Sequence, residues 1–220
     1  MNERFTEMLG VLAHEMRTPI AAILGYQELL SDGIFGEIEQ RGQEPLSRIA
    51  YSAKQLLYLI DGVQEVMSPP NKRLETNPQH FDPAPLLQKC IDNAATDAQG
   101  RNVTLAEEIA SDLPRVHGDP DRFARAIDLA LSAAIKVSHG ASIDITAHAV
   151  NRGVRVSFTG TGLVAGRDDP PTDHLKANGG PPLTGAGLRL AIVRHLAGQM
   201  SGDIHLVPSP QGTTLVVTFG

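Results

Sequence analysis

The chain has 220 residues, which is enough for one large domain or two small ones. Its hydrophobic fraction of 41% is ordinary for a soluble globular protein, and charges of both signs are interspersed around a net charge of −6. This balance excludes the basic stripe of a nucleic-acid-binding protein. No apolar run is long enough to cross a bilayer, and the N-terminus lacks the apolar core of a signal peptide. A single cysteine, Cys90, suits a reducing compartment and a core position on a helix. We therefore expect a cytoplasmic protein that binds no nucleic acid and has no membrane segment.

The first 70 residues carry the pattern of a helical hairpin. Apolar residues recur every three or four positions over 5–30, and Ser31-Asp32-Gly33 supplies a helix end. A second helix follows, with seven apolar positions in heptad register over 46–67, and Ser68-Pro69-Pro70 stops it. A two-helix hairpin leaves an apolar face of each helix uncovered. We expect two chains to close this face as a homodimeric four-helix bundle through residues 1–70.

Residues 71–220 form a second expected domain, in which helical and strand patterns are mixed. We expect three helices on one mainly antiparallel sheet, an α/β sandwich. A loop rich in Gly, Pro and Asp spans 160–185. The helices are expected at 85–99, 119–135 and 186–200, and the strands at 103–109, 142–149, 154–158, 203–207 and 213–219.

The segment Ala13-His14-Glu15-Met16-Arg17-Thr18-Pro19 closely resembles the H box of sensor histidine kinases. The resemblance extends over the whole hairpin, which is the dimerisation and phosphoacceptor domain of that family. The later region resembles the family's ATP-binding domain of the GHKL or Bergerat type, through Gly118-Asp119-Pro120-Asp121-Arg122, the stretch 187–193 and the stretch 209–214. The resemblance covers essentially the whole chain.

The H box assigns chemistry to four residues. Imidazole accepts phosphoryl groups well near neutral pH, and the resemblance makes His14 the phosphoacceptor. It implies that Glu15 orients the ring and accepts its proton, that Thr18 positions a water, and that Arg17 compensates phosphate charge. Pro19 removes a backbone hydrogen bond and should bend the helix. Without these neighbours His14 would be read as a surface histidine. A zinc helix of the His-Glu-x-x-His type is excluded because Thr18 stands where the second histidine belongs, and we expect no metal site.

The nucleotide motifs of the resemblance are degraded at their chemical positions. The two asparagines of the family's N box fall on Leu129 and Ala133, and an alanine methyl supplies no oxygen ligand for magnesium. The next motif, Asp-x-Gly-x-Gly in the family, keeps Gly160 and Gly162. Its aspartate, which accepts a hydrogen bond from adenine, is Phe158.

The third motif keeps Gly185 and Gly187 but replaces its last glycine with Arg189, where a side chain obstructs close approach to phosphates. We therefore expect no cofactor, with magnesium only on a partner. Lys136 and Asp119 also match family positions, but we expect a solvated lysine and a helix cap.

Three functions remain open. We favour a histidine phosphotransferase that passes phosphoryl groups between His14 and the aspartates of response-regulator receiver domains, with autokinase activity lost. One alternative is a pseudokinase scaffold or inhibitor that binds a receiver or a kinase. Another is a divergent but active kinase, as the catalytic fragment of a longer sensor. We expect receivers to dock beside His14, near Ala21 and Ala22.

Overall fold

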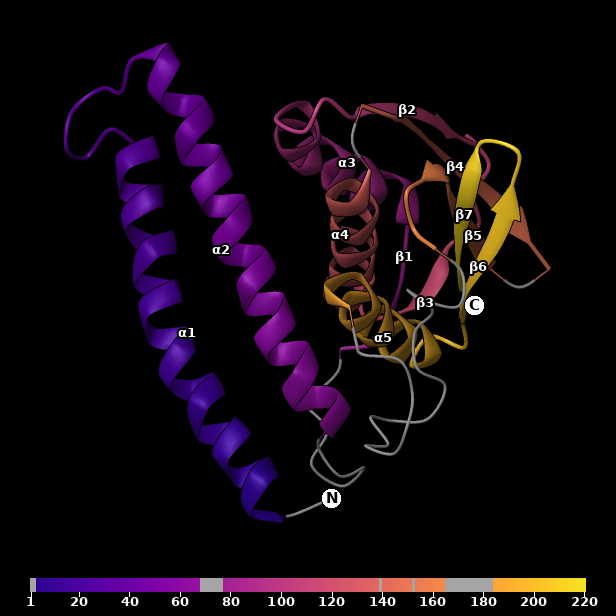
Figure 1. Cartoon of the computed structure of the whole chain (residues 1–220), viewed down its shortest axis with the longest axis horizontal. Helices are drawn as coiled ribbons and strands as arrows, with labels where there is room; N and C mark the ends of the chain where they lie inside the picture. Colours follow the sequence, from indigo (N-terminus) through magenta and orange to yellow (C-terminus); the bar gives the residue numbers. More distant parts are fainter. Residues whose placement is uncertain (1–2, 68–76, 139, 152, 165–183) are drawn as a thin grey trace. The chain divides into compact units, whose positions relative to one another are not determined.

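The computed structural model describes residues 3–67, 77–138, 140–151, 153–164 and 184–220, with side chains of 3–7, 9 and 67 left aside. The chain divides into two compact units, Met1–Leu74 and Glu75–Gly220 (Figure 1). The expected boundary after residue 70 falls in 68–76, outside the described residues. Most of the expected loop at 160–185 lies outside them as well, because 165–183 are not described.

The first unit is the expected helical hairpin. Helix α1 spans Glu3–Ser31 and helix α2 spans Gln40–Met67, and α1 runs through Pro19 as one continuous helix. Gly33 ends α1 in a left-handed conformation with φ of 72°. The Ile34 amide donates to the Leu29 carbonyl at 3.1 Å and the Gly33 amide to the Leu30 carbonyl at 3.2 Å, which is the Schellman arrangement.

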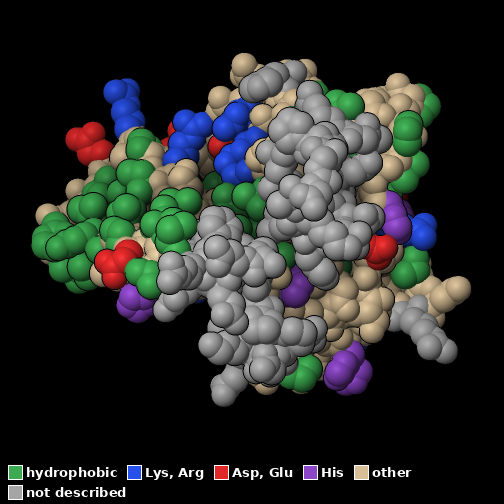
Figure 2. Space-filling model, turned by 60° about the horizontal axis from the view of Figure 1, so that its bottom comes forward, with side chains coloured by type: hydrophobic (Ala, Val, Ile, Leu, Met, Phe, Trp, Pro, Cys, Tyr) green, Lys and Arg blue, Asp and Glu red, His purple; other side chains and the backbone are tan. Residues whose placement is uncertain are grey.

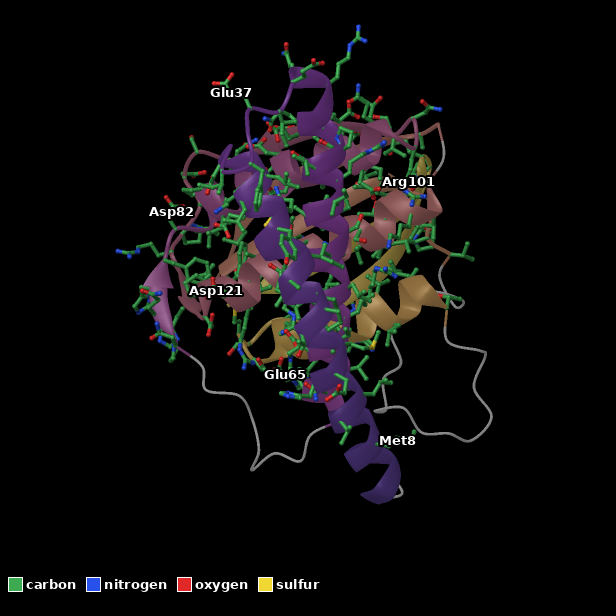
Figure 3. All side chains as sticks on the ribbon, turned by 90° about the vertical axis from the view of Figure 1, so that its left-hand side faces the viewer. Met8, Glu37, Glu65, Asp82, Arg101 and Asp121 are labelled. Atoms are coloured by element: carbon green, nitrogen blue, oxygen red, sulfur yellow. The ribbon has the colours of Figure 1, made fainter. Side chains whose placement is uncertain are left out.

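The hydrophobic stripes of both helices divide between two faces. Ala13 and Ile20 of α1 pack with Ala53 and Ile60 of α2 in the core of the hairpin, and Met16, Leu24 and Leu57 cover this core. Other members of the same stripes are exposed: Leu12 by 51%, Ile23 by 46%, Ile49 by 47% and Leu56 by 42%. Hydrophobic side chains accordingly gather on the surface of the hairpin (Figure 2), and Figure 3 shows exposed Met8 near the start of α1. One hairpin therefore leaves part of its apolar pattern exposed.

The second unit is built around a five-stranded sheet of order β2-β4-β5-β7-β6, in which β2 pairs with β4 in parallel and the other pairs are antiparallel. Strands β1 and β3 form a separate antiparallel pair. The helices are α3 (Pro83–Gln99), α4 (Pro120–Val137) and α5 (Gly185–Gly198), and the strands are β1 (Gln79–Phe81), β2 (Thr104–Ile109), β3 (Val116–Gly118), β4 (Ser142–Val150), β5 (Gly153–Thr161), β6 (Ile204–Ser209) and β7 (Gly212–Phe219).

The three helices of this unit cover one face of the sheet (Figure 1). The core between them includes Phe123, whose ring centroid lies 5.3 Å from that of Phe81 and 4.6 Å from that of Phe219. Cys90 is buried on α3, as expected. This is the α/β sandwich that the sequence predicts.

Several details of the second unit differ from the sequence expectation: α4 ends at Val137 and α5 at Gly198, and β5 continues to Thr161 into the expected loop. Helix α3 starts at Pro83 rather than at residue 85, because the Asp82 carboxylate accepts from the Ala84 amide at 3.0 Å and caps the helix there. Strand β3 was not predicted, since three residues are too few for an alternating pattern. The expected Asp119 cap of α4 is confirmed, with its carboxylate accepting from the Asp121 and Arg122 amides at 3.0 Å and 3.3 Å.

Candidate functional site

His14 lies on the solvent-exposed side of α1, and Glu15 and Thr18 are exposed beside it. Residues four apart on a helix are neighbours on its surface, so His14 and Thr18 share one face. The flanking residues Ala13 and Ile20 are buried in the hairpin core, with exposed fractions of 6% and 3%. Core packing on one side of α1 therefore presents the imidazole on the other.

Arg17 points toward α2 and is bound there. Its Nε and Nη2 atoms both lie 2.7 Å from Oδ1 of Asp61, and Nη2 also donates to Oε1 of Gln64. Gln64 in turn donates through Nε2 to the Gly10 carbonyl of α1 at 3.2 Å. We call Arg17, Asp61, Gln64 and the Gly10 carbonyl the Arg17 clamp. Because Arg17 is paired with a carboxylate here, its expected part in phosphate compensation stays a prediction.

Asp61, Gln64 and Gly10 were not identified from the sequence. Asp61 follows the core residue Ile60 directly, and Gln64 lies one turn further along α2, so both border the core stripe. Polar residues in that place are ordinary on a helix that packs by one face. Their pairing with the H box becomes visible only when the hairpin is folded.

The family's N-box positions lie on one face of α4. Leu129 and Ala133 are both fully buried, and helical spacing aligns them with Arg122 and Lys136. This face meets α5, because Arg122 Nη1 donates to Oε1 of Gln199 at the end of that helix. The side chains of Leu129 and Ala133 place no oxygen atoms on this face of α4. The face is therefore apolar in its middle, where the family's magnesium ligand is expected.

Phe158, at the position of the family's adenine-binding aspartate, is part of the sheet core. It lies opposite Ile145 in β4 and Leu215 in β7, and all three side chains are fully buried. An aromatic ring offers no acceptor for an adenine amino group. The position is therefore used for packing.

The two glycines of the same motif have structural reasons to be glycine. Gly160 has φ of 86°, and a Cβ there would lie 2.4 Å from the Ser142 carbonyl oxygen. A Cβ on Gly162 would lie 2.3 Å from the Val137 carbonyl oxygen. The Gly162 amide also donates to Ser138 Oγ at 2.8 Å. Their presence therefore needs no nucleotide to explain it.

Arg189 folds back over the first turn of α5. Its Nη1 donates to the Gly185 carbonyl at 2.8 Å, while Thr184 Oγ1 caps the helix by accepting from the Gly187 amide at 2.8 Å. The guanidinium therefore lies at the helix start where the resemblance places phosphate-binding glycines.

Lys136 differs from the solvated lysine that the sequence predicts. Burial lowers the pKa of its ammonium group below the usual 10.5, and the positive charges of Arg189 and Arg101 lower this pKa further, against the opposing effect of Asp97. Arg101 is paired with Asp97, with Nε 3.6 Å from Oδ1. In Figure 3 Arg101 lies at the opposite end of the unit from Asp82 and Asp121, which mark the starts of α3 and α4. Positive charge thus gathers where α3 and α4 end and α5 begins.

Two family descriptions match the chain. Residues 6–67 match the His Kinase A (phospho-acceptor) domain, and residues 118–220 match the histidine kinase-, DNA gyrase B- and HSP90-like ATPase family. The chain is 27% identical to an uncharacterized sensor-like histidine kinase of Rhizobium meliloti over 99% of its own length and 43% of that protein. It is 28% identical to the sensor protein EvgS of Escherichia coli over 97% and 18%, and 29% identical to the sensor protein DivL of Caulobacter vibrioides over 93% and 26%.

Solved structures share the fold. The chain superposes on full-length ShkA in complex with AMPPNP with a TM-score of 0.61 and 23% identity, covering 97% of this chain and 45% of that one. It superposes on the histidine kinase AdeS of Acinetobacter baumannii with a TM-score of 0.56 and 21% identity, covering 94% and 97%. The chain spans less than half the length of the curated relatives named above.

The chain belongs to the sensor histidine kinase family of two-component signalling, as the two domain matches show. Proteins of this family typically dimerise and signal to response regulators. Among the described residues, no helix combines the length and apolar character needed to span a membrane.

Proposed function

We propose that this member of the sensor histidine kinase family is a histidine phosphotransferase, which exchanges phosphoryl groups between His14 and the aspartates of receiver domains without using ATP. The observation that carries the proposal is the placement of Phe158. Its ring is fully buried between Ile145 and Leu215 at the position of the family's adenine-binding carboxylate. His14, in contrast, is exposed on a helix that matches the phosphoacceptor domain.

Three further residues support the loss of nucleotide use. Ala133 has no oxygen to offer magnesium, and Leu129 beside it is equally apolar. Arg189 covers the first turn of α5, where phosphates need close backbone approach. The residues present do not fit a magnesium nucleotide, so we derive no step through one. Magnesium belongs to the receiver partner in this proposal.

The transfer step balances without a nucleotide. A lone pair of the His14 imidazole attacks phosphorus of the receiver's aspartyl phosphate and forms a P–N bond. The P–O bond to the aspartate breaks, and the aspartate leaves as a carboxylate. The ring proton passes to the exposed Glu15 carboxylate or to water. In a separate reaction, Thr18 positions a water molecule that hydrolyses the receiver's aspartyl phosphate. The reverse reaction phosphorylates a second receiver.

The working unit in this proposal is a homodimer through residues 1–70. The exposed apolar residues Leu12, Ile23, Ile49 and Leu56 support it, because each belongs to the apolar stripe of its helix yet stays more than 40% exposed within one hairpin. A second copy supplies the same pattern and closes a four-helix bundle.

The test compares two phosphoryl donors. The protein is incubated with radiolabelled ATP and, separately, with purified receiver domains charged with radiolabelled acetyl phosphate. We expect label from a receiver and none from ATP. His14→Ala should abolish the label, and His148→Ala, which removes an exposed histidine on β4, should retain it. Label from ATP would identify an active kinase and overturn the proposal. Binding of receivers without transfer would identify a scaffold.

A further inference from the structure

The part of α1 that carries His14 lies between two residues that weaken a helix. Gly10 stands four residues before His14 and Pro19 five residues after it, and both are inside the helix. Glycine and proline are the least favourable residues in a helix interior. Pro19 has no amide hydrogen, so the Glu15 carbonyl lacks its helical donor. The phosphoacceptor segment is therefore the place where local sequence supports α1 least.

The Arg17 clamp holds this segment at both ends. Asp61 binds the guanidinium of Arg17, three residues after His14, through two contacts of 2.7 Å. Gln64 binds the same guanidinium and donates to the Gly10 carbonyl at 3.2 Å. In helix geometry the Gly10 carbonyl is also the acceptor for the His14 amide. One residue pair on α2 thus fixes the turns before and after the imidazole.

The clamp is stronger than an ordinary surface ion pair. The Arg17 side chain is 36% exposed and that of Asp61 is 22% exposed, so both charges are partly shielded from water. Charge-assisted hydrogen bonds in such a network exceed the value of an isolated exposed pair. Asp61 and Gln64 lie one turn apart on α2 and have different roles. Asp61 pairs with the charge of Arg17, and Gln64 links Arg17 to the backbone of α1.

We propose that Asp61 and Gln64 are positioning residues, which keep the phosphoacceptor turn of α1 helical and so hold His14 in line for phosphoryl transfer. They touch neither the imidazole nor the phosphoryl group, and they act by fixing the backbone that carries His14. Preorganisation of this kind raises a reaction rate because the reacting groups need no further ordering. The effect on transfer rests on the proposed function, whereas the effect on the backbone does not.

Backbone order is tested by hydrogen exchange measured by mass spectrometry on the full chain. Asp61→Asn removes the charge at nearly constant size, and Gln64→Leu removes the link to Gly10. In both variants, exchange of the amides from residue 11 to 18 should rise by about tenfold, the effect of losing one charged hydrogen bond. Glu44→Gln is the matched control, because it removes an exposed carboxylate from α2 about 25 Å away along the helix. It should leave exchange unchanged.

Transfer is tested with a receiver that labels the wild-type protein. In Asp61→Asn the maximal transfer rate should fall by about tenfold at an unchanged half-saturating receiver concentration, because positioning changes and docking does not. The double variant Arg17→Asp with Asp61→Arg restores the ion pair in reverse. It should recover both exchange protection and transfer if Arg17 acts through the clamp.

Unchanged exchange at residues 11–18 in Asp61→Asn and Gln64→Leu would overturn the inference. Exchange protection restored in the swapped variant without recovery of transfer would also overturn it, since Arg17 would then act on the phosphoryl group itself. If no receiver labels the wild type, the proposed function fails, and the exchange measurements still decide whether the clamp orders the His14 segment.

Discussion

Phe158 in β5 lies directly opposite Leu215 in β7, and both side chains are fully buried. The pair joins the central strand of the sheet to its neighbour. Phe158 stands where the family's motif has a carboxylate. A residue that binds adenine must face a cavity, whereas this one fills the core. The stability of the second unit therefore depends on it.

Phe158→Ala should lower the free energy of unfolding by about 3–5 kcal/mol, because it removes a buried ring and leaves a cavity. Phe158→Asp should cost at least as much, since a carboxylate enters the apolar core. Urea denaturation measures both. Phe35→Ala is the control: Phe35 is 66% exposed, and its loss should change the free energy by less than about 0.5 kcal/mol. A stable Phe158→Asp variant would contradict the assignment of Phe158 to the core.

Nucleotide titration tests whether the surface between α4 and α5 has lost the ability to bind ATP. We expect calorimetry to show no saturable, magnesium-dependent binding of a non-hydrolysable ATP analogue to the wild-type chain. Arg189→Gly restores the family's glycine and opens the first turn of α5. It should still bind no nucleotide, because Ala133 gives magnesium no ligand and Phe158 fills the adenine position. Saturable binding by the wild type would refute the argument from these three residues.

The lowered pKa of Lys136 predicts a pH dependence of stability. Its pKa lies below 10.5 in the folded chain and near 10.5 in the unfolded chain, chiefly because of burial and secondly because of Arg189. Between these two pKa values the unfolded state binds more protons, so stability rises with pH in that window. Below the window the charged ammonium group destabilises the fold.

Lys136→Met should therefore raise the free energy of unfolding at pH 7 and reduce the rise in stability between the lowered pKa and pH 10.5. The measurement is urea unfolding across this range. Lys89→Met, on the exposed side of α3, controls for the loss of any lysine charge. If stability depends on pH in the same way in both variants, the charged Lys136 side chain does not destabilise the fold.

The exposed apolar residues of the hairpin predict which substitution separates the proposed dimer. Ile49→Glu places a charge on a residue that is 47% exposed in one hairpin and that the proposed four-helix bundle would cover. Light scattering should give twice the chain mass for the wild type and the single-chain mass for the variant. Ser52→Glu adds the same charge at another exposed position of α2 and should stay dimeric. Equal masses for all three proteins would contradict this interface.

The helical hairpin could be predicted from sequence because its pattern is local. Heptad spacing and the glycine cap depend on residues close along the chain, and Gly33 takes the left-handed conformation that the cap requires. The same holds for the Asp119 cap of α4. Which stripe residues face α2 was not determined locally, since Ile20 is buried and Ile23 is exposed within one repeat pattern.

The sequence by itself predicted the family, which the domain matches confirm. It also predicts His14 as the phosphoacceptor and the loss of nucleotide-binding chemistry, because each rests on which side chain stands at a given position, and both stay predictions. Tertiary structure alone decided what the replacements do: Phe158 packs against Leu215, and Arg189 bonds back to the Gly185 carbonyl. It also decided that Arg17 binds Asp61, a residue 44 positions away. Such contacts follow from how helices and strands meet in space, and no local pattern carries that information.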